Sequence, residues 1–161
     1  LNIPVDHDNE PYIWLVHVIS PSTYSEERFQ QILNKLSSLN LGVICCPSAA
    51  ISMRQIRNIT SPTYNSIARV LDMLAAGIWV RTGSDNICDI TSPAGTIDLI
   101  DELFVLCNAM RYYDLNVISK LGSGIRIQEN ERLNLIEHIN RDLQECAKIS
   151  EKFISKQGAI I

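Results

Sequence analysis

Three short apolar runs in this sequence each lie beside polar side chains that could do chemistry. His17 is in the first run, Ser48 follows the second, and Asp85 and Asn86 follow the third. An imidazole and a carboxylate presented to one cavity make part of a site for zinc or a harder divalent cation. A carboxylate beside a metal-activated water can also take its proton. Catalytic metal sites normally use three protein ligands, so two residues do not complete one.

Each of these residues also has a structural interpretation. A single histidine in an apolar strand is usually a core residue with its hydrogen bonds made, and an aspartate after a strand is usually a helix cap or a loop anchor. Asn86 tolerates the left-handed conformation, so it suits a turn as well as a substrate contact. Cys45 and Cys46 point to opposite faces of a strand, and we interpret them as small apolar fillers.

The elements that position these residues alternate between strand and helix patterns. Residues 12–19 form a nearly continuous apolar run rich in β-formers, which predicts a strand buried on both faces. Thr23 and Glu26 have capping-box spacing at the start of a predicted helix that ends at residue 40. Residues 41–46 predict a second buried strand.

The same pattern then repeats. A polar loop leads to a helix that Asn65 or Ser66 caps and Gly77 ends. Residues 78–80 predict a third strand, and the apolar residues between Ile97 and Met110 have helical spacing. Successive units of this kind predict parallel strands, in part of a (β/α) barrel or in an open doubly wound sheet. In both architectures the loops after the strands share one face, where active sites lie.

Composition limits the class of protein. The chain has 161 residues, 46% of them hydrophobic, and a formal net charge of -4. This predicts one globular unit that does not bind nucleic acid or insert into a membrane. The five cysteines include no C-x-x-C pair and the N-terminus lacks a signal-peptide pattern, which favours reduced thiols in the cytoplasm.

Four longer stretches carry a family resemblance: WLVHVIS, LGVICCPSAAISMR, SPTYNSIARVLDMLAAGI and VRTGSDNICDITSPAGTIDLIDELF. Together, over about residues 12–113, they resemble the C-terminal half of the amidohydrolase superfamily, specifically the cytosine-deaminase-like metal-dependent hydrolases. The most specific element is the Gly-Ser-Asp-Asn tail of the last strand. The resemblance implies an α/β fold that is the C-terminal part of a (β/α)8 TIM barrel, about strands six to eight.

The resemblance also implies roles for individual residues. Asp85 corresponds to the aspartate that binds the metal and acts as general acid/base on the hydrolytic water. His17 corresponds to a histidine that is a metal ligand or lies beside the metal and the substrate. Asn86 and Ser48 are candidate substrate contacts. The implied cofactor is a divalent cation, zinc or iron. The implied substrate is a small molecule with a C–N bond in a cyclic amide, amidine or amino-heterocycle, such as a pyrimidine-like or triazine-like ring.

Part of the family's ligand set has no counterpart in this sequence. Family members carry a His-x-His pair on the first barrel strand and another histidine on the fifth. The three histidines here are His7, His17 and His138, and no His-x-His occurs. We interpret His7 and His138 as solvated. A complete barrel takes about 250 residues, so the chain, which begins with Leu1, is expected to be the C-terminal portion of a longer enzyme.

Two function hypotheses therefore stay open. The chain is part of a metal-dependent C–N hydrolase, inactive in isolation, or it is a truncated, non-catalytic remnant or interaction fragment of that family. A third interpretation, an open α/β module that holds a phosphate at Thr82–Ser84, lacks a glycine-rich loop motif.

The chain divides into a polar lead-in over 1–11, a partial barrel over 12–114 and a peripheral helical segment over 115–161. Gly122 interrupts the apolar pattern of the last segment, and from Glu129 a charged stretch with helical recurrence predicts one or two amphipathic helices. Strands that are separated from the rest of a barrel expose their edges and apolar faces. This predicts that the chain on its own forms oligomers or aggregates.

Overall fold

The computed structural model describes residues 10–52, 67–90, 93 and 95–157, with only the backbone described for 153–157. Its centre is a three-stranded parallel sheet of β1 (Trp14–Val16), β2 (Gly42–Cys45) and β3 (Val80–Thr82), in the spatial order β1-β2-β3. Helix α1 (Glu26–Ser38) connects β1 to β2. The short helices α2 (Pro47–Ser52) and α3 (Val70–Ala75) follow β2. The parallel strands and their helical crossovers confirm the predicted strand-helix units.

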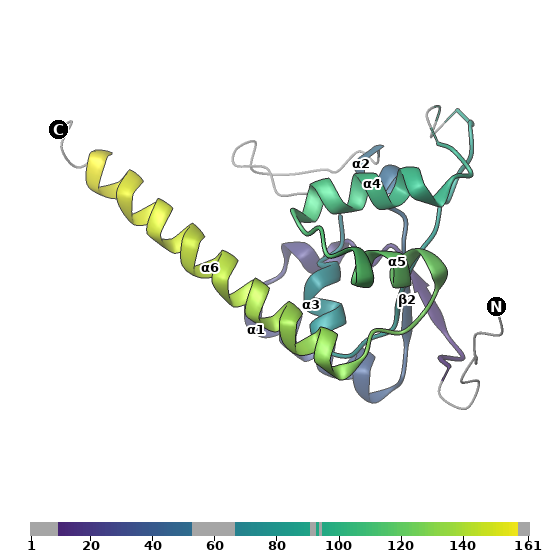
Figure 1. The fold of residues 1–161 in the computed structure, drawn as a ribbon, viewed down its shortest axis with the longest axis horizontal. Coiled ribbons are helices and arrows are strands. Elements are labelled where there is room, and N and C mark those ends of the chain that lie inside the picture. Colours follow the sequence, from purple (N-terminus) through teal and green to yellow (C-terminus); the bar gives the residue numbers. More distant parts are fainter. Residues whose placement is uncertain (1–9, 53–66, 91–92, 94, 158–161) are drawn as a thin grey trace.

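Three further helices follow the sheet: α4 (Leu99–Met110), α5 (Leu115–Ser123) and α6 (Glu129–Gln157). Helix α6 packs on α3 at its beginning, and its far end projects away from the rest of the molecule (Figure 1). Although α6 has 29 residues, it is charged along its length, and no helix in the described part of the chain is long and apolar enough to cross a membrane.

The strand register separates the two faces of the sheet. Val43 and Val80 are paired neighbours that point into the core, where they join Phe29 of α1 and Met73 of α3. The opposite face carries Val16, Ile44 and Arg81, which are also register neighbours. Val16 is 53% exposed. The second face is therefore less covered than the first, although parallel sheets are normally buried on both faces.

The C-terminal helices share the core of the sheet. Val117 and Leu121 of α5 and Leu135 of α6 belong to the same buried cluster as the strand residues. Arg132 Nε donates to the carbonyl of Ala75 at 3.0 Å, and Arg126 Nη2 donates to the carbonyl of Gly77 at 2.9 Å. These bonds satisfy carbonyls at the end of α3 that lack intrahelical partners.

Several predicted boundaries were wrong for local reasons. The first strand ends at Val16, not Ile19, because His17 and Val18 have positive φ angles of 69° and 50°. Helix α1 begins after Ser25, whose side chain accepts from the backbone N–H of Arg28, while Thr23 lies in the preceding 3-10 turn (Ser20–Thr23).

The segments around β2 and β3 also differ from the prediction. Pro47 does not end the second strand in a loop but opens α2, since proline suits the first turn of a helix. The third strand covers Val80–Thr82 rather than residues 78–80. Asn65 and Ser66, the predicted caps, lie outside the described residues.

The third predicted helix is α4, and the apolar residues that mark it do not all lie on its buried face. Ile97, Ile100 and Phe104 are 78%, 72% and 70% exposed, whereas Leu106 is fully buried. Apolar residues surround much of α4, so their spacing does not single out one face. His138 is not simply solvated either, because its ring packs edge-to-face against Tyr112 at 4.9 Å between centroids.

Candidate functional site

His17 and Asp85 meet at the carboxyl end of the sheet. The distance from His17 Nε2 to Asp85 Oδ2 is 3.3 Å, and their side chains are 23% and 29% exposed. His17 follows β1 and Asp85 follows β3, so the pair spans the end of β2. The structure thus confirms that these two residues lie close together.

The backbone on both sides of the pair is anchored to β2. The N–H of His17 donates to the carbonyl of Ile44, and the N–H of Gly83 donates to the carbonyl of Cys45, both at 2.9 Å. These bonds continue the parallel ladders one residue beyond β1 and β3. The two functional side chains therefore leave a sheet edge whose position is fixed by hydrogen bonds.

Both residues of the pair have left-handed backbone conformations. The φ angle is 69° at His17 and 58° at Asp85. Such angles are uncommon in residues other than glycine and cost free energy unless the surrounding structure holds them. They turn the chain away from the strand direction at the two points where the imidazole and the carboxylate are presented, and backbone strain of this kind is frequent at functional sites.

Three buried polar atoms lack hydrogen-bond partners within the described part of the chain: Nδ1 of His17, Nε of Arg81 and Oγ1 of Thr82. An unsatisfied buried polar atom normally costs about 1–3 kcal/mol. The second ring nitrogen of His17 is thus available for a ligand, a water or a residue that the structure does not describe.

The thiols next to the pair stay protonated. Burial raises the pKa of Cys46 to about 11, with smaller contributions from the carboxylates of Asp85 and Glu102. Burial also raises the pKa of Cys45 to about 12, with smaller contributions from Cys46 and Glu102. Since the thiolate is the nucleophile and metal ligand, these shifts agree with the interpretation of both cysteines as core fillers.

Sequence patterns missed Glu102, which is 1% exposed. One of its carboxylate oxygens, Oε2, accepts a hydrogen bond from the backbone N–H of Ser48 at 2.9 Å. This bond ties α4 to the first turn of α2, immediately after the strand that ends between His17 and Asp85. The sequence offers one signal for a buried carboxylate here, which is the presence of acidic residues in a mostly apolar helix. Apolar periodicity alone does not tell whether Glu102 or the exposed Asp101 is the buried one.

Ser48 and Asn86 lie at a cavity beside the pair rather than around it. This α2–α4 cavity has a volume of about 470 Å³ and is bounded by α2, α4 and the segment after β3. The two neighbours of Asp85 in sequence, Ser84 and Asn86, both line it, and His17 and Asp85 do not. The turn at Asp85 therefore presents one side chain to His17 and its two neighbours to the cavity.

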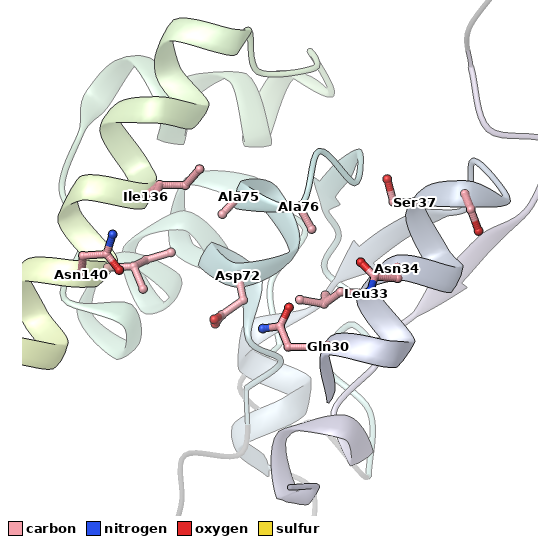
Figure 2. Close-up of a pocket in the computed structure, with 11 residues that line it drawn as sticks. Gln30, Leu33, Asn34, Ser37, Asp72, Ala75, Ala76, Ile136 and Asn140 are labelled. Atoms are coloured by element: carbon pink, nitrogen blue, oxygen red, sulfur yellow. The ribbon is translucent and has the colours of Figure 1, made fainter. Parts of the chain in front are cut away.

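A second hollow lies among the helices. This groove of about 480 Å³ runs between α1, α3 and α6, with Gln30 and Asn34 on one side and Ile136 and Asn140 on the other (Figure 2). Its residues come mostly from the C-terminal halves of α1 and α3, which lie toward the amino end of the parallel strands. Active sites of α/β folds lie at the opposite end, so the groove is a weaker candidate.

Within the described residues, no group of three or more His, Cys, Asp and Glu side chains is arranged to hold a metal ion. His17 and Asp85 provide one nitrogen and one carboxylate. His7 lies outside the described residues.

Comparisons with known proteins concern the fold. No protein-family model matches the chain, and no curated protein matches it. Two structures of 5-methylcytosine deaminase from Klebsiella pneumoniae match, one liganded with 5-fluorocytosine and one with phosphonocytosine, with TM-scores of 0.58 and 0.57. This chain shares part of the fold of that deaminase. The identity is 21% in both cases, and each match covers 64% of this chain and 25% of the deaminase chain.

The chain therefore spans about a quarter of the solved structures that it matches. A small parallel sheet with helical crossovers is consistent with part of a barrel. At this identity the likeness concerns architecture, and the roles of His17, Asp85, Asn86 and Ser48 stay predictions.

Proposed function

We propose that this chain is the C-terminal portion of a metal-dependent hydrolase that cleaves a C–N bond of a cyclic amide, amidine or amino-heterocycle. The observation that carries the proposal is the 3.3 Å approach of His17 and Asp85 at the carboxyl end of a parallel sheet. The partial fold likeness to a deaminase that binds 5-fluorocytosine and phosphonocytosine favours a pyrimidine-like ring over a triazine-like one.

A divalent cation, zinc or iron, fits the chemistry of this pair. The donors are an imidazole and a carboxylate, and the buried Nδ1 of His17 has no hydrogen-bond partner among the described residues. His17 and Asp85 would hold the cation together with ligands from outside the described residues. When bound, the cation supplies Lewis-acid activation of water.

The residues of this chain would orient the reactants and move a proton. Asp85 accepts a proton from the attacking water and delivers it to the leaving nitrogen, because its carboxylate is partly exposed and held at the end of β3. Nε2 of His17 lies 3.3 Å from Oδ2 of Asp85, so the imidazole and the carboxylate face the same side of the site. Ser48 and Asn86, which line the neighbouring α2–α4 cavity, contact the substrate from the side of the Asp85 turn.

The position of the sheet in a barrel is part of the proposal. If β1, β2 and β3 are strands six, seven and eight, the face that carries Val16 and Ile44 points to the barrel interior. The 53% exposure of Val16 supports this, since earlier strands of the same enzyme would cover that face. The cytoplasmic location also stays a prediction, based on the reduced cysteines.

The competing proposal is a non-catalytic remnant or interaction fragment. It is favoured by the number of ligands, since the described residues hold no group of three metal-binding side chains. The two proposals differ in what precedes Leu1. A His-x-His motif in frame upstream supports the hydrolase, and an upstream frame without it supports the remnant.

A functional test compares the chain alone with the chain joined to its upstream reading frame. We expect the longer protein, supplied with zinc or iron, to release ammonia from cytosine, and the chain alone to release none. Asp85→Asn should lower kcat of the longer protein by at least about a thousandfold, because it removes a general acid/base and a metal ligand together. His17→Ala should lower metal content. Asp142→Asn, which changes an exposed carboxylate on α6, is the matched control.

The result of that comparison can go against the proposal in two ways. Hydrolysis of cytosine by the 161-residue chain alone would refute the idea that ligands are missing from it. Full activity of the longer protein after Asp85→Asn would refute the assignment of the site.

A further inference from the structure

Most of the residues that line the α2–α4 cavity have no role in the proposed hydrolysis, and Ser48 and Asn86 are the exceptions. Its polar lining comes from four hydroxyls, one amide and one carboxylate: Ser48, Ser52, Ser84, Thr96, Asn86 and Asp101. Phe104 and Val105 of α4 form its apolar side. A volume of about 470 Å³ lies within the usual range for small-molecule pockets.

Hydrogen bonds fix the walls of this cavity in relation to one another. The carboxylate of Glu102, buried below the lining, accepts from the N–H of Ser48 at 2.9 Å and joins α4 to α2. In the segment after β3, the N–H and the thiol of Cys88 both donate to the carbonyl of Gly95, at 3.1 and 3.0 Å. Thr96 Oγ1 donates to Asp101 Oδ2 at 2.8 Å. The cavity is therefore formed before any ligand arrives.

The charge of the lining selects the ligand. Asp101 is the one ionisable side chain that lines the cavity within the described residues, so the cavity favours a cation and disfavours an anion. The hydrogen bond from Thr96 occupies Oδ2 of Asp101, which leaves Oδ1 for a ligand. Phe104 is 70% exposed, and an aromatic face next to a carboxylate suits an ammonium group.

We propose that the α2–α4 cavity binds a small hydroxylated ammonium compound. Its ammonium group donates to Asp101 and lies against the ring of Phe104, and its hydroxyls bond with the serine side chains of α2 and of the segment after β3. Because Ser84 and Asn86 flank Asp85, the bound compound lies next to the His17–Asp85 pair. This inference does not depend on the hydrolytic activity.

The test uses two sugars that differ in one group, glucosamine and glucose. Saturation-transfer difference NMR observes the small molecule, and it tolerates self-association of the protein. At a pH near 6 the amine of glucosamine is protonated. We expect glucosamine to bind the 161-residue chain about tenfold more tightly than glucose, as for one hydrogen bond to a charged group.

Variants separate this site from general surface binding. Asp101→Asn should reduce the affinity for glucosamine to that for glucose, and Phe104→Leu should weaken glucosamine binding. Both residues are exposed on α4, so neither change threatens the fold, which circular dichroism verifies. Asp142→Asn, on the projecting part of α6, should change nothing. Equal affinity for the two sugars, no saturation transfer to either, or glucosamine binding that survives Asp101→Asn would each overturn the proposal.

Discussion

Leu135 is expected to anchor helix α6 to the body of the protein. The side chain is 0% exposed and lies in the same buried cluster as Met73 of α3. Leu135→Ala removes three buried carbons, worth about 2.4 kcal/mol at about 0.8 kcal/mol per carbon. The cavity left behind adds about 1 kcal/mol when the neighbours relax only in part. We therefore expect a loss of about 3 kcal/mol in the free energy of unfolding.

The matched control is on the same helix. Leu143 is 62% exposed in a part of α6 where every residue from 141 to 152 is exposed, so Leu143→Ala should cost less than about 1 kcal/mol. Urea denaturation followed by circular dichroism measures both variants. Equal effects of the two substitutions would show that α6 does not share the core, and would refute the packing of the C-terminal helices described above.

Three further outcomes follow from the core. Gly42→Ala should destabilise the protein by about 1–3 kcal/mol, because the new Cβ would clash with the ring of Trp14. The double variant with Trp14→Leu should recover much of that loss in urea denaturation. Cys45 and Cys46 should react with a thiol reagent at pH 8 far more slowly than the exposed Cys146, and a fast reaction of all three would contradict their burial. Stability should also fall as the pH rises from about 9 toward 12, because the folded state holds the pKa of Cys45 and Cys46 above the ordinary thiol value and so resists their ionisation.

The candidate site shows where sequence patterns are sufficient. Each apolar run marks a strand, and parallel strands bring their carboxyl ends to one edge, so His17 and Asp85 could be expected to meet. The structure shows how the two side chains come within 3.3 Å of each other. Both residues have positive φ angles, and backbone hydrogen bonds extend the ladders beyond the strands. Histidine and aspartate adopt such angles more often than most residues, but the residue type alone does not dictate them.

Glu102 and the α2–α4 cavity show where sequence patterns are insufficient. The bond from Ser48 to Glu102 joins residues 54 positions apart, and no local spacing signals it. The same holds for α4, whose exposed face carries Ile100 and Phe104 and whose buried face carries Glu102. An apolar helix can present either side to the core, and long-range packing decides which side is buried.

By itself, the sequence determined the alternation of strands and helices, the parallel sheet and the shared edge at which His17 and Asp85 lie. These follow from apolar periodicity and from the geometry of parallel crossovers, which are local properties of the chain. Only the tertiary structure decided that Ser48 and Asn86 line a separate cavity and that Leu135 of α6 reaches the core. Those facts depend on contacts between distant segments, where burial is a property of the packed molecule and not of any one segment.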